Sequence, residues 1–367
     1  MNQDFSIGYY RGNEWGDTIL DVLADYPQIR EVYFPLPDQD SGRSSLSYNN
    51  DPQEVLRDLH SDLHAIRSHG IRLNLLLNAS CYSDRLKNPS FTDNLRERLY
   101  MYVEEFGVSS VTTTQPSFAL MIKRMFDENV ETRASVNMFL NSIDSMKYLE
   151  EEFDAFYPTR ELYRSVDELV QWREWADTHG KKLYALVNSG CMAFCPWAIT
   201  DNNATAHGIN DLHMADGTEI PTCVSWFSKH KGLTTIVKGC YIRPEDVQYY
   251  SGLFDGFKIA TRAHFLPRLA VQAYVKGTYH GYITDILEPS NTHFFMSGDC
   301  IPNDAFPQDW YRKTSRCGRA CHKCNYCERI AESIARKYND DNNFRHFLFD
   351  SESELADKLA AFRNKNR

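Results

Sequence analysis

The sequence predicts a (β/α)8 TIM barrel, because short apolar runs alternate with longer amphipathic stretches along most of the chain. Several of the amphipathic stretches end in glycine, as at Gly70, Gly107 and Gly180, where helices commonly stop. The competing architecture is an open doubly wound sheet. No glycine-rich phosphate turn follows the first apolar run, and the strand count fits closure. The expected strands are Phe5–Tyr10, Glu31–Pro35, Leu73–Asn78, Ser109–Thr114, Thr132–Met138, Ala155–Pro158, Leu183–Asn188 and Gly256–Ala260.

The amphipathic stretches between these runs are expected to form the outer helices of the barrel. They are residues 18–26, 52–70, 91–107, 117–128, 142–153 and 166–180. The barrel is expected to span residues 1–297, with an insertion at about 191–243 that is too long for a plain connector. Residues 298–367 are expected to form a cysteine-rich C-terminal appendage. The pattern of its last part, Glu352–Lys365, predicts an amphipathic helix.

Composition limits the kinds of function that the chain can have. The chain has 367 residues, of which 42% are hydrophobic and 25% charged, which suits a globular protein with one large core or two domains. Its formal net charge of −10 argues against general DNA or RNA binding, although a local basic patch for an RNA substrate stays open. The sequence shows neither a secretory signal nor an apolar run of membrane-spanning length. A cytoplasmic location is expected, where ten cysteines are not paired in structural disulfides.

The most specific chemical pattern is the run Cys317, Cys321, Cys324 and Cys327, spaced Cys-x3-Cys-x2-Cys-x2-Cys. Four thiolates on so short a segment predict a soft-metal site, and the spacing favours a 4Fe-4S cluster. Zinc is the alternative at this run, although zinc sites usually take two separated pairs. The first three cysteines also match the spacing of radical S-adenosylmethionine enzymes. Those enzymes carry the motif near the first strand, whereas this run lies near the C-terminus.

A second set of cysteines is dispersed along the chain. Cys81 follows the third expected strand, Cys191 and Cys195 follow the seventh, and Cys223 lies in the insertion. Since the ends of barrel strands converge on one face, these thiols are candidates for a second 4Fe-4S site at the mouth. The alternative is that each one is a small packing residue. Cys240 and Cys300 are expected to be packing residues. Cys240 is the alternative ligand if one of the four dispersed cysteines does not bind the cluster.

Polar residues at the strand ends are expected to line the same mouth. Among them Arg160, Lys258 and Arg262 are the most informative, because a cation near a barrel core needs an anionic partner. They predict a pocket for a substrate carboxylate or phosphate. The alternative is internal salt bridging, with Glu161 as the obvious partner of Arg160. The other expected mouth residues include Arg11, Asn78, Asn137 and Asn188.

Several stretches resemble the peptidase U32 family. They are LLLNASCY, VNSGCMAFCPW, YIRPEDVQYYSGLFDGFKIATR and PNDAFPQDWYRKTSRCGRACHKCNYC, and the likeness extends from about Phe5 to Cys327. The family name implies a collagenase-like peptidase. However, the sequence contains neither an HExxH zinc pair nor a recognisable motif for a Ser–His–Asp or Cys–His site.

The better-understood relatives are barrels that carry a 4Fe-4S cluster on four cysteines. They take part in oxygen-independent hydroxylation of the ubiquinone ring, or in hydroxylation of tRNA and ribosomal RNA bases with prephenate as the oxygen source. By this resemblance Cys81, Cys191, Cys195 and Cys223 would hold the barrel cluster. The quinone and RNA proteins do not share the Cys317–Cys327 run, so their substrates do not carry over to this chain.

The leading hypothesis is therefore an iron–sulfur-dependent redox enzyme, or a subunit of one, that modifies a small molecule or an RNA base. It would act with an electron donor or a related partner subunit, and the run at Cys317–Cys327 would be an electron relay. The second hypothesis is a U32-type peptidase or other hydrolase. The third is a non-catalytic scaffold whose metals only hold the fold together.

Overall fold

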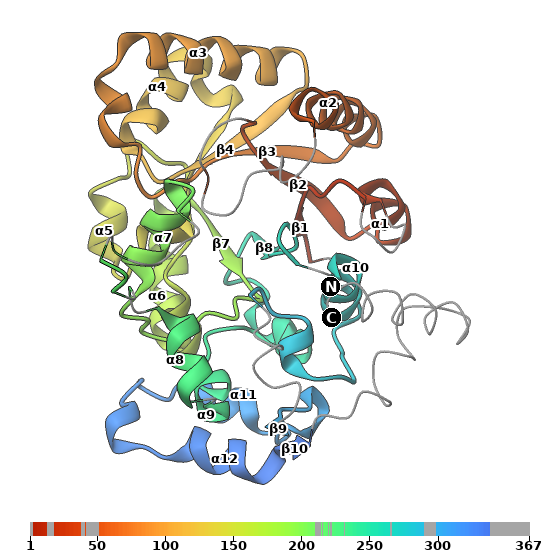
Figure 1. The fold of residues 1–367 in the computed structure, drawn as a ribbon, viewed down its shortest axis with the longest axis vertical. Coiled ribbons are helices and arrows are strands. Elements are labelled where there is room, and N and C mark those ends of the chain that lie inside the picture. The colour runs from red at the N-terminus through yellow and green to blue at the C-terminus, as the bar shows by residue number, and fades with distance from the viewer. Residues whose placement is uncertain are drawn as a thin grey trace.

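The computed structural model describes residues 3–12, 18–37, 41, 51–209, 214, 216–218, 220, 222–230, 232–264, 266–289 and 299–337. In it β1–β8 form a closed barrel of parallel strands surrounded by helices (Figure 1). The strand β1 closes the barrel, because Phe5 pairs with Ile29 of β2 on one side and with Phe257 of β8 on the other. The predicted TIM barrel is confirmed, and each of the eight expected runs overlaps one strand of the barrel.

The barrel strands are short. Each begins at the expected first residue or one to two residues before it, and most end before the expected last residue. They are β1 (Phe5–Gly8), β2 (Ile29–Pro35), β3 (Arg72–Leu77), β4 (Val108–Thr113), β5 (Glu131–Ala134), β6 (Ala155–Phe156), β7 (Lys182–Leu186) and β8 (Gly256–Ile259). A further pair, β9 (Asp299–Cys300) and β10 (Arg336–Lys337), is antiparallel and lies outside the barrel.

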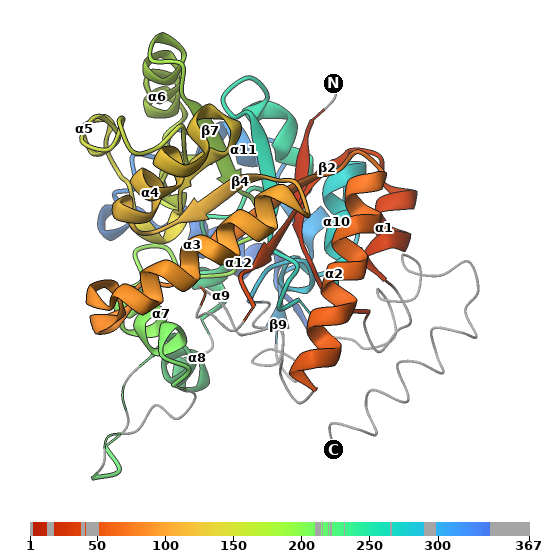
Figure 2. The ribbon, with the colours of Figure 1, turned by 90° about the horizontal axis from the view of Figure 1, so that it is seen from above.

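Helices cover the outside of the barrel, as the view from above shows (Figure 2). They begin at the capping residues that the sequence supplies, such as Thr18 before α1, Asp51 before α2 and Asn88 before α3. The outer helices are α1 (Ile19–Asp25), α2 (Pro52–Ser68), α3 (Pro89–Glu104), α4 (Pro116–Phe126), α5 (Ile143–Lys147), α6 (Val166–Thr178) and α10 (Pro267–Lys276).

The helix expected over residues 142–153 is shorter than predicted. It ends as α5 at Lys147, and the acidic run Glu150–Glu152 that follows is not helical. Three carboxylates in the last turn would lie against the negative end of the helix dipole. The chain instead turns so that Asp154 accepts hydrogen bonds from the amide and hydroxyl of Thr132, which fixes the approach to β6. The helix expected at Glu352–Lys365 lies outside the described residues.

The insertion and the C-terminal appendage pack together beside the barrel. The insertion contributes α7 (Ala198–Ala206), α8 (Cys223–His230) and α9 (Leu233–Val237), and the appendage contributes α11 (Trp310–Thr314) and α12 (Tyr326–Ile334). Helix α12 packs against α9, and Figure 1 shows the blue appendage beneath the green insertion helices. Within the described ranges, no helix is long and apolar enough to cross a membrane.

The interior of the barrel contains a buried ion pair. Arg133 of β5 donates two hydrogen bonds of 2.8 Å to the two carboxylate oxygens of Glu31 on β2, and each side chain is only 3% exposed. Asn74 of β3 donates to the same carboxylate, and Glu131 accepts from the other side of the guanidinium. The guanidinium also lies 4.2 Å from the ring centre of Tyr184. These side chains form a charged layer across the barrel interior, which connects β2 and β3 to β5 and β7.

We predict that Arg133→Met lowers the free energy of unfolding by about 3–5 kcal/mol, because it leaves the buried Glu31 carboxylate without its cation. Urea denaturation followed by circular dichroism measures the change. The exposed pair of Asp144 and Lys147 provides the control, since Asp144→Asn is expected to change stability by less than about 0.5 kcal/mol. Equal effects of the two substitutions would show that the barrel does not depend on this ion pair.

Candidate functional site

A cavity of about 320 Å3 lies at the mouth of the barrel, where the strands end. Inward-facing residues of the strands form its floor, among them Tyr33 of β2, Leu76 of β3 and Lys258 of β8. The loops that follow the strands and the first part of the insertion form its walls. Active sites of TIM barrels lie at this face. Six of the predicted site residues line the cavity, namely Arg160, Cys191, Cys195, Cys223, Lys258 and Arg262.

Lys258 lies on the floor of this mouth cavity. Its ammonium is 3.8 Å from the centre of the Tyr33 ring and 5.7 Å from that of Tyr157. Among the residues that the structure describes, no carboxylate forms an ion pair with it. Burial, with repulsion from Arg262, lowers the pKa of Lys258 to about 7. Its charge therefore changes within the physiological pH range.

Arg160 enters the cavity from the short 3-10 helix η4 (Arg160–Arg164), which follows β6. Its guanidinium donates to the hydroxyl of Ser189. Burial lowers the pKa of Arg160, but the charge of the neighbouring Cys191 sulfur outweighs burial and raises it. The expected partner Glu161 is occupied elsewhere, because it accepts from the Thr159 hydroxyl and the Phe194 amide. Burial raises the pKa of Glu161, but these hydrogen bonds outweigh burial and hold the pKa below its usual value. Arg160 is thus directed at the cavity and its thiol.

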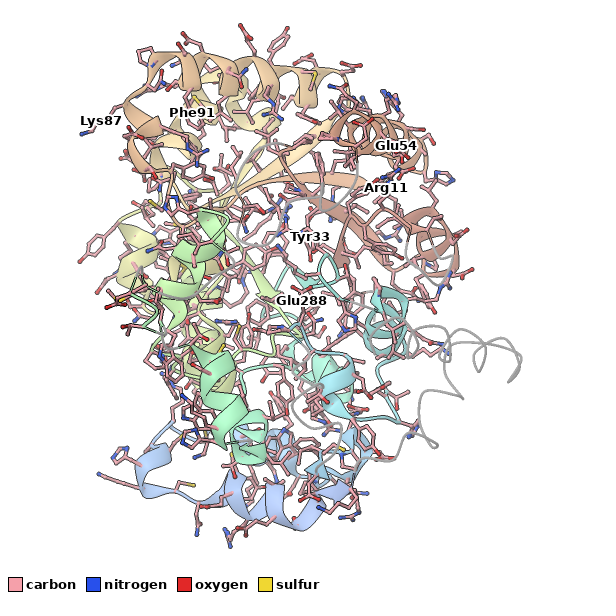
Figure 3. All side chains as sticks on the ribbon, viewed as in Figure 1. Arg11, Tyr33, Glu54, Lys87, Phe91 and Glu288 are labelled. Carbon is pink, nitrogen blue, oxygen red and sulfur yellow. The ribbon has the colours of Figure 1, made fainter. Side chains whose placement is uncertain are left out.

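Arg262 and Glu288 form the side of the cavity next to β1. Glu288 is 4% exposed and accepts a hydrogen bond from the amide of Ala263. Gly8 makes room for this wall, because a Cβ there would lie 2.9 Å from the Tyr33 ring and 3.0 Å from Cβ of Arg262. Figure 3 shows Tyr33 and Glu288 in the middle of the molecule.

The expected mouth cation Arg11 has a different position. It forms ion pairs of 2.5 Å with Glu54 and Asp58 of α2, outside the cavity, and Figure 3 shows Arg11 beside Glu54. Asn78 and Asn137 line the cavity as expected. Asn188 is fully buried and braces the loops instead, since its amide joins Ala260 to Ile286.

The loop that carries Cys191 and Cys195 is tightly packed. The amide of Gly190 donates to the carbonyl oxygen of Glu288, and a Cβ at Gly190 would lie 1.9 Å from the carbonyl oxygen of Pro289. Glycine is therefore required directly before Cys191. Burial raises the pKa of Cys195, and the charge of Cys191 adds to this shift. Cys223, the first residue of α8, lines the same cavity.

Cys81 is not among the residues that line the mouth cavity. It follows β3 at the same end of the barrel, accepts a hydrogen bond from the amide of Ser83, and packs against the hydrophobic core. The structure thus brings together three of the four dispersed cysteines. Across the described residues, no three His, Cys, Asp or Glu side chains are close enough to hold one metal ion. The three thiols instead share a cavity with room for a larger group.

A second cavity, of about 280 Å3, lies between η4, the end of α9 and the appendage. Five cysteines line it, namely Cys240, Cys317, Cys321, Cys324 and Cys327. The structure therefore brings the C-terminal run together in one place. All ten cysteines fall in the described ranges, and none of them forms a disulfide. Cys240 and Cys300 are 5% and 1% exposed, as expected for packing residues.

Sequence reasoning missed Tyr33, Glu288 and Asp201, which also line the mouth cavity. The alternation of side chains along β2 places Tyr33 on the same inward face as Glu31, so period-two reasoning would have identified it. Asp201 lies on α7, whose position depends on how the insertion folds back. Glu288 follows a turn near the end of the barrel, and no periodic pattern marks it.

Comparison with known proteins identifies one similar curated protein. The chain is 27% identical, over 312 residues, to the protein named "uncharacterized protease MJ1657" of Methanocaldococcus jannaschii. The match covers 83% of this chain and 89% of the archaeal protein. No protein-family profile matches the sequence.

The solved structures that match include the U32 peptidase Mk0906, at 14% sequence identity and a TM-score of 0.49. That match covers 71% of this chain and 92% of the other. The maltogenic α-amylase AmyB of Thermotoga neapolitana matches at 14% identity and a TM-score of 0.35, over 50% of this chain and 59% of that one. Over most of its length, the chain is thus similar to an archaeal protein that is named a protease.

Proposed function

We propose that this protein is an enzyme of the U32 peptidase type that acts on an anionic substrate in the mouth cavity. The observation that carries the proposal is the convergence of Arg160, Lys258 and Arg262 on one cavity at the carboxyl ends of the barrel strands. Neither Arg160 nor Lys258 forms an ion pair with a carboxylate in the described part of the chain. A carboxylate or phosphate of the substrate would complete their interactions.

Peptide hydrolysis is the first candidate reaction, supported by the similarity to the archaeal protein that is named a protease. In this case the cations would bind a carboxylate of the peptide, at its C-terminus or on an acidic side chain. Cys191 is the candidate nucleophile, because a neighbouring positive charge favours the thiolate and Arg160 supplies that charge. Cys195 is less suited, since burial raises the pKa of its thiol.

Oxygen-independent hydroxylation of a small molecule or an RNA base is the second candidate reaction, supported by the three thiols of the mouth cavity. Cys191, Cys195 and Cys223 fit as ligands of an iron–sulfur cluster, while Cys81 requires a movement of its loop to join them. A bound 4Fe-4S cluster would supply one-electron chemistry. Arg160 and Lys258 would orient an anionic substrate beside it. The similarity to a protease-named protein supports hydrolysis more directly than this reaction.

We predict that the cavity binds sulfate more weakly as the pH rises through about 7, because Lys258 then loses its proton. Isothermal titration is expected to show affinity about three- to tenfold lower at pH 8.5 than at pH 6. Sulfate does not titrate in this range, so the change reports on the protein. The charged groups that act on Lys258 are Arg262, Glu31, Arg133 and Glu288.

Lys258→Met is expected to bind weakly at both pH values and to remove the pH dependence. Arg11→Met is the matched control, because Arg11 is a cation near the barrel that lies outside the cavity. A pH dependence that persists in Lys258→Met would show that Lys258 does not contact the anion.

The two candidate reactions are separated by one set of cysteine variants. If the protein is a hydrolase, chelator-treated enzyme is expected to cleave acidic peptides, and Cys191→Ser is expected to lower the rate at least 100-fold. If the thiols hold a cluster, anaerobic reconstitution is expected to add about four irons at this site, which Cys191→Ser and Cys223→Ser lose. Cys300→Ser, at a buried cysteine outside the cavity, is the control. If the protein shows no peptide cleavage and binds no iron at this site, both assignments are contradicted.

A further inference from the structure

Five thiols and four cations line the second cavity, between η4, α9 and the appendage. The cations are Arg164, Lys238, Lys313 and Arg319, and the carboxylate that lines it is Glu161. The cavity therefore combines sulfur ligands that suit a soft metal with cations that can balance the charge of an anionic group.

The loop that carries these thiols turns sharply between Cys317 and Cys321. Gly318 and Arg319, between Cys317 and Cys321, both have positive φ angles, of 63° and 56°. Arg319 is a non-glycine residue in this region, and its guanidinium is held by a hydrogen bond to Glu168 of α6. The amide of Tyr326 donates to the sulfur of Cys324 at 3.5 Å. An amide directed at a sulfur stabilises a thiolate.

Arg164 links this loop to the barrel. Its guanidinium donates to the carbonyl oxygens of Val237 and Gly239, at 2.7 and 2.8 Å, and lies 5.4 Å from the ring centre of Trp310. A second guanidinium nitrogen, Nη1, donates to the sulfur of Cys327 at 3.5 Å. These contacts fix a positive charge against Cys327, on the barrel side of the cavity.

We propose that Cys317, Cys321, Cys324 and Cys327 bind an iron–sulfur cluster in this second cavity, with Arg164 as a positioning residue for Cys327. The cavity has a volume of about 280 Å3. A tetrahedral zinc site draws four sulfurs to about 2.3 Å from one ion and leaves no such space. Four cysteines are the usual ligand set of a 4Fe-4S cluster.

The site is distinct from the mouth cavity but shares a wall with it. Cys191 and Cys195 line the mouth cavity, whereas Ala193 and Phe194 between them line the second cavity. The helix η4 likewise directs Arg160 to the mouth and Arg164 to the appendage. The proposal stands without the proposed function, because its ligands all belong to the appendage.

The test is to purify the full chain without oxygen, reconstitute it with iron and sulfide, and measure iron, sulfide and zinc per chain. We expect Cys324→Ser and Cys317→Ser to lose about four irons relative to wild type. Cys240→Ser, in the same cavity, and Cys300→Ser, outside it, are expected to keep them. Mössbauer spectra and electron paramagnetic resonance after dithionite reduction identify the cluster. Arg164→Gln is expected to retain iron and to alter the resonance spectrum. An unchanged spectrum would show that Arg164 does not position Cys327 at the cluster.

The variants also separate this site from the mouth site. If Cys191→Ser keeps all of the iron and Cys324→Ser loses it, the appendage cluster stands and the mouth cluster fails. If the reverse is observed, the appendage proposal is wrong. Stoichiometric zinc that iron and sulfide do not displace would also overturn it. Thermal denaturation of each variant checks that a loss of iron does not follow from unfolding.

Discussion

The ion pair between Arg133 and Glu31 determines how the interior of this barrel is filled. A guanidinium and a carboxylate that are each 3% exposed are costly to desolvate, so their attraction must be supported by further hydrogen bonds. Asn74 of β3 provides that support for Glu31, and Glu131, on the same strand as Arg133, provides it for the guanidinium. The mouth cavity lies beyond this charged layer, toward the ends of the strands. Its floor residue Lys258 experiences the charges of both Glu31 and Arg133, so the charged layer also influences the site.

The site depends on short connections that serve two cavities at once. The helix η4 contributes Arg160 to the mouth and Arg164 to the second cavity, and the loop from Cys191 to Cys195 forms part of both walls. Packing fixes this loop, because Gly190 lies against the backbone of Pro289 and Phe194 donates to Glu161. The two cavities therefore share a wall whose conformation these contacts fix. The appendage is part of the site's architecture, since α12 packs against α9 of the insertion.

The alternation of apolar runs and amphipathic stretches follows directly from burial. Together with the count of eight runs and the lack of a glycine-rich phosphate turn, it predicted the closed barrel. It also placed Arg160, Lys258 and Arg262 at one face, since strand ends must converge there. The pattern could not separate Arg11 from these cations. That difference depends on Glu54 and Asp58, two carboxylates on a helix that follows much later in the chain. Asp201 and Glu288 were missed for the same reason, because tertiary packing alone brings them to the cavity.

The cysteines show the same division between local and tertiary information. Spacing predicted that Cys317–Cys327 would gather in one place, since few residues separate them, and the second cavity agrees with that expectation. For the dispersed cysteines the barrel topology was needed. It brings Cys191, Cys195 and Cys223 to the mouth, whereas the turn at Ser83 holds the sulfur of Cys81 apart.

The central claim is that the mouth cavity binds the anionic part of a substrate. A crystal structure of the protein soaked in selenate, with data collected at the selenium edge, tests it most directly. The account predicts an anomalous peak inside the cavity, within hydrogen-bonding distance of Arg160 or Lys258. Selenate bound only at the outer surface, with the cavity filled by water, would contradict it.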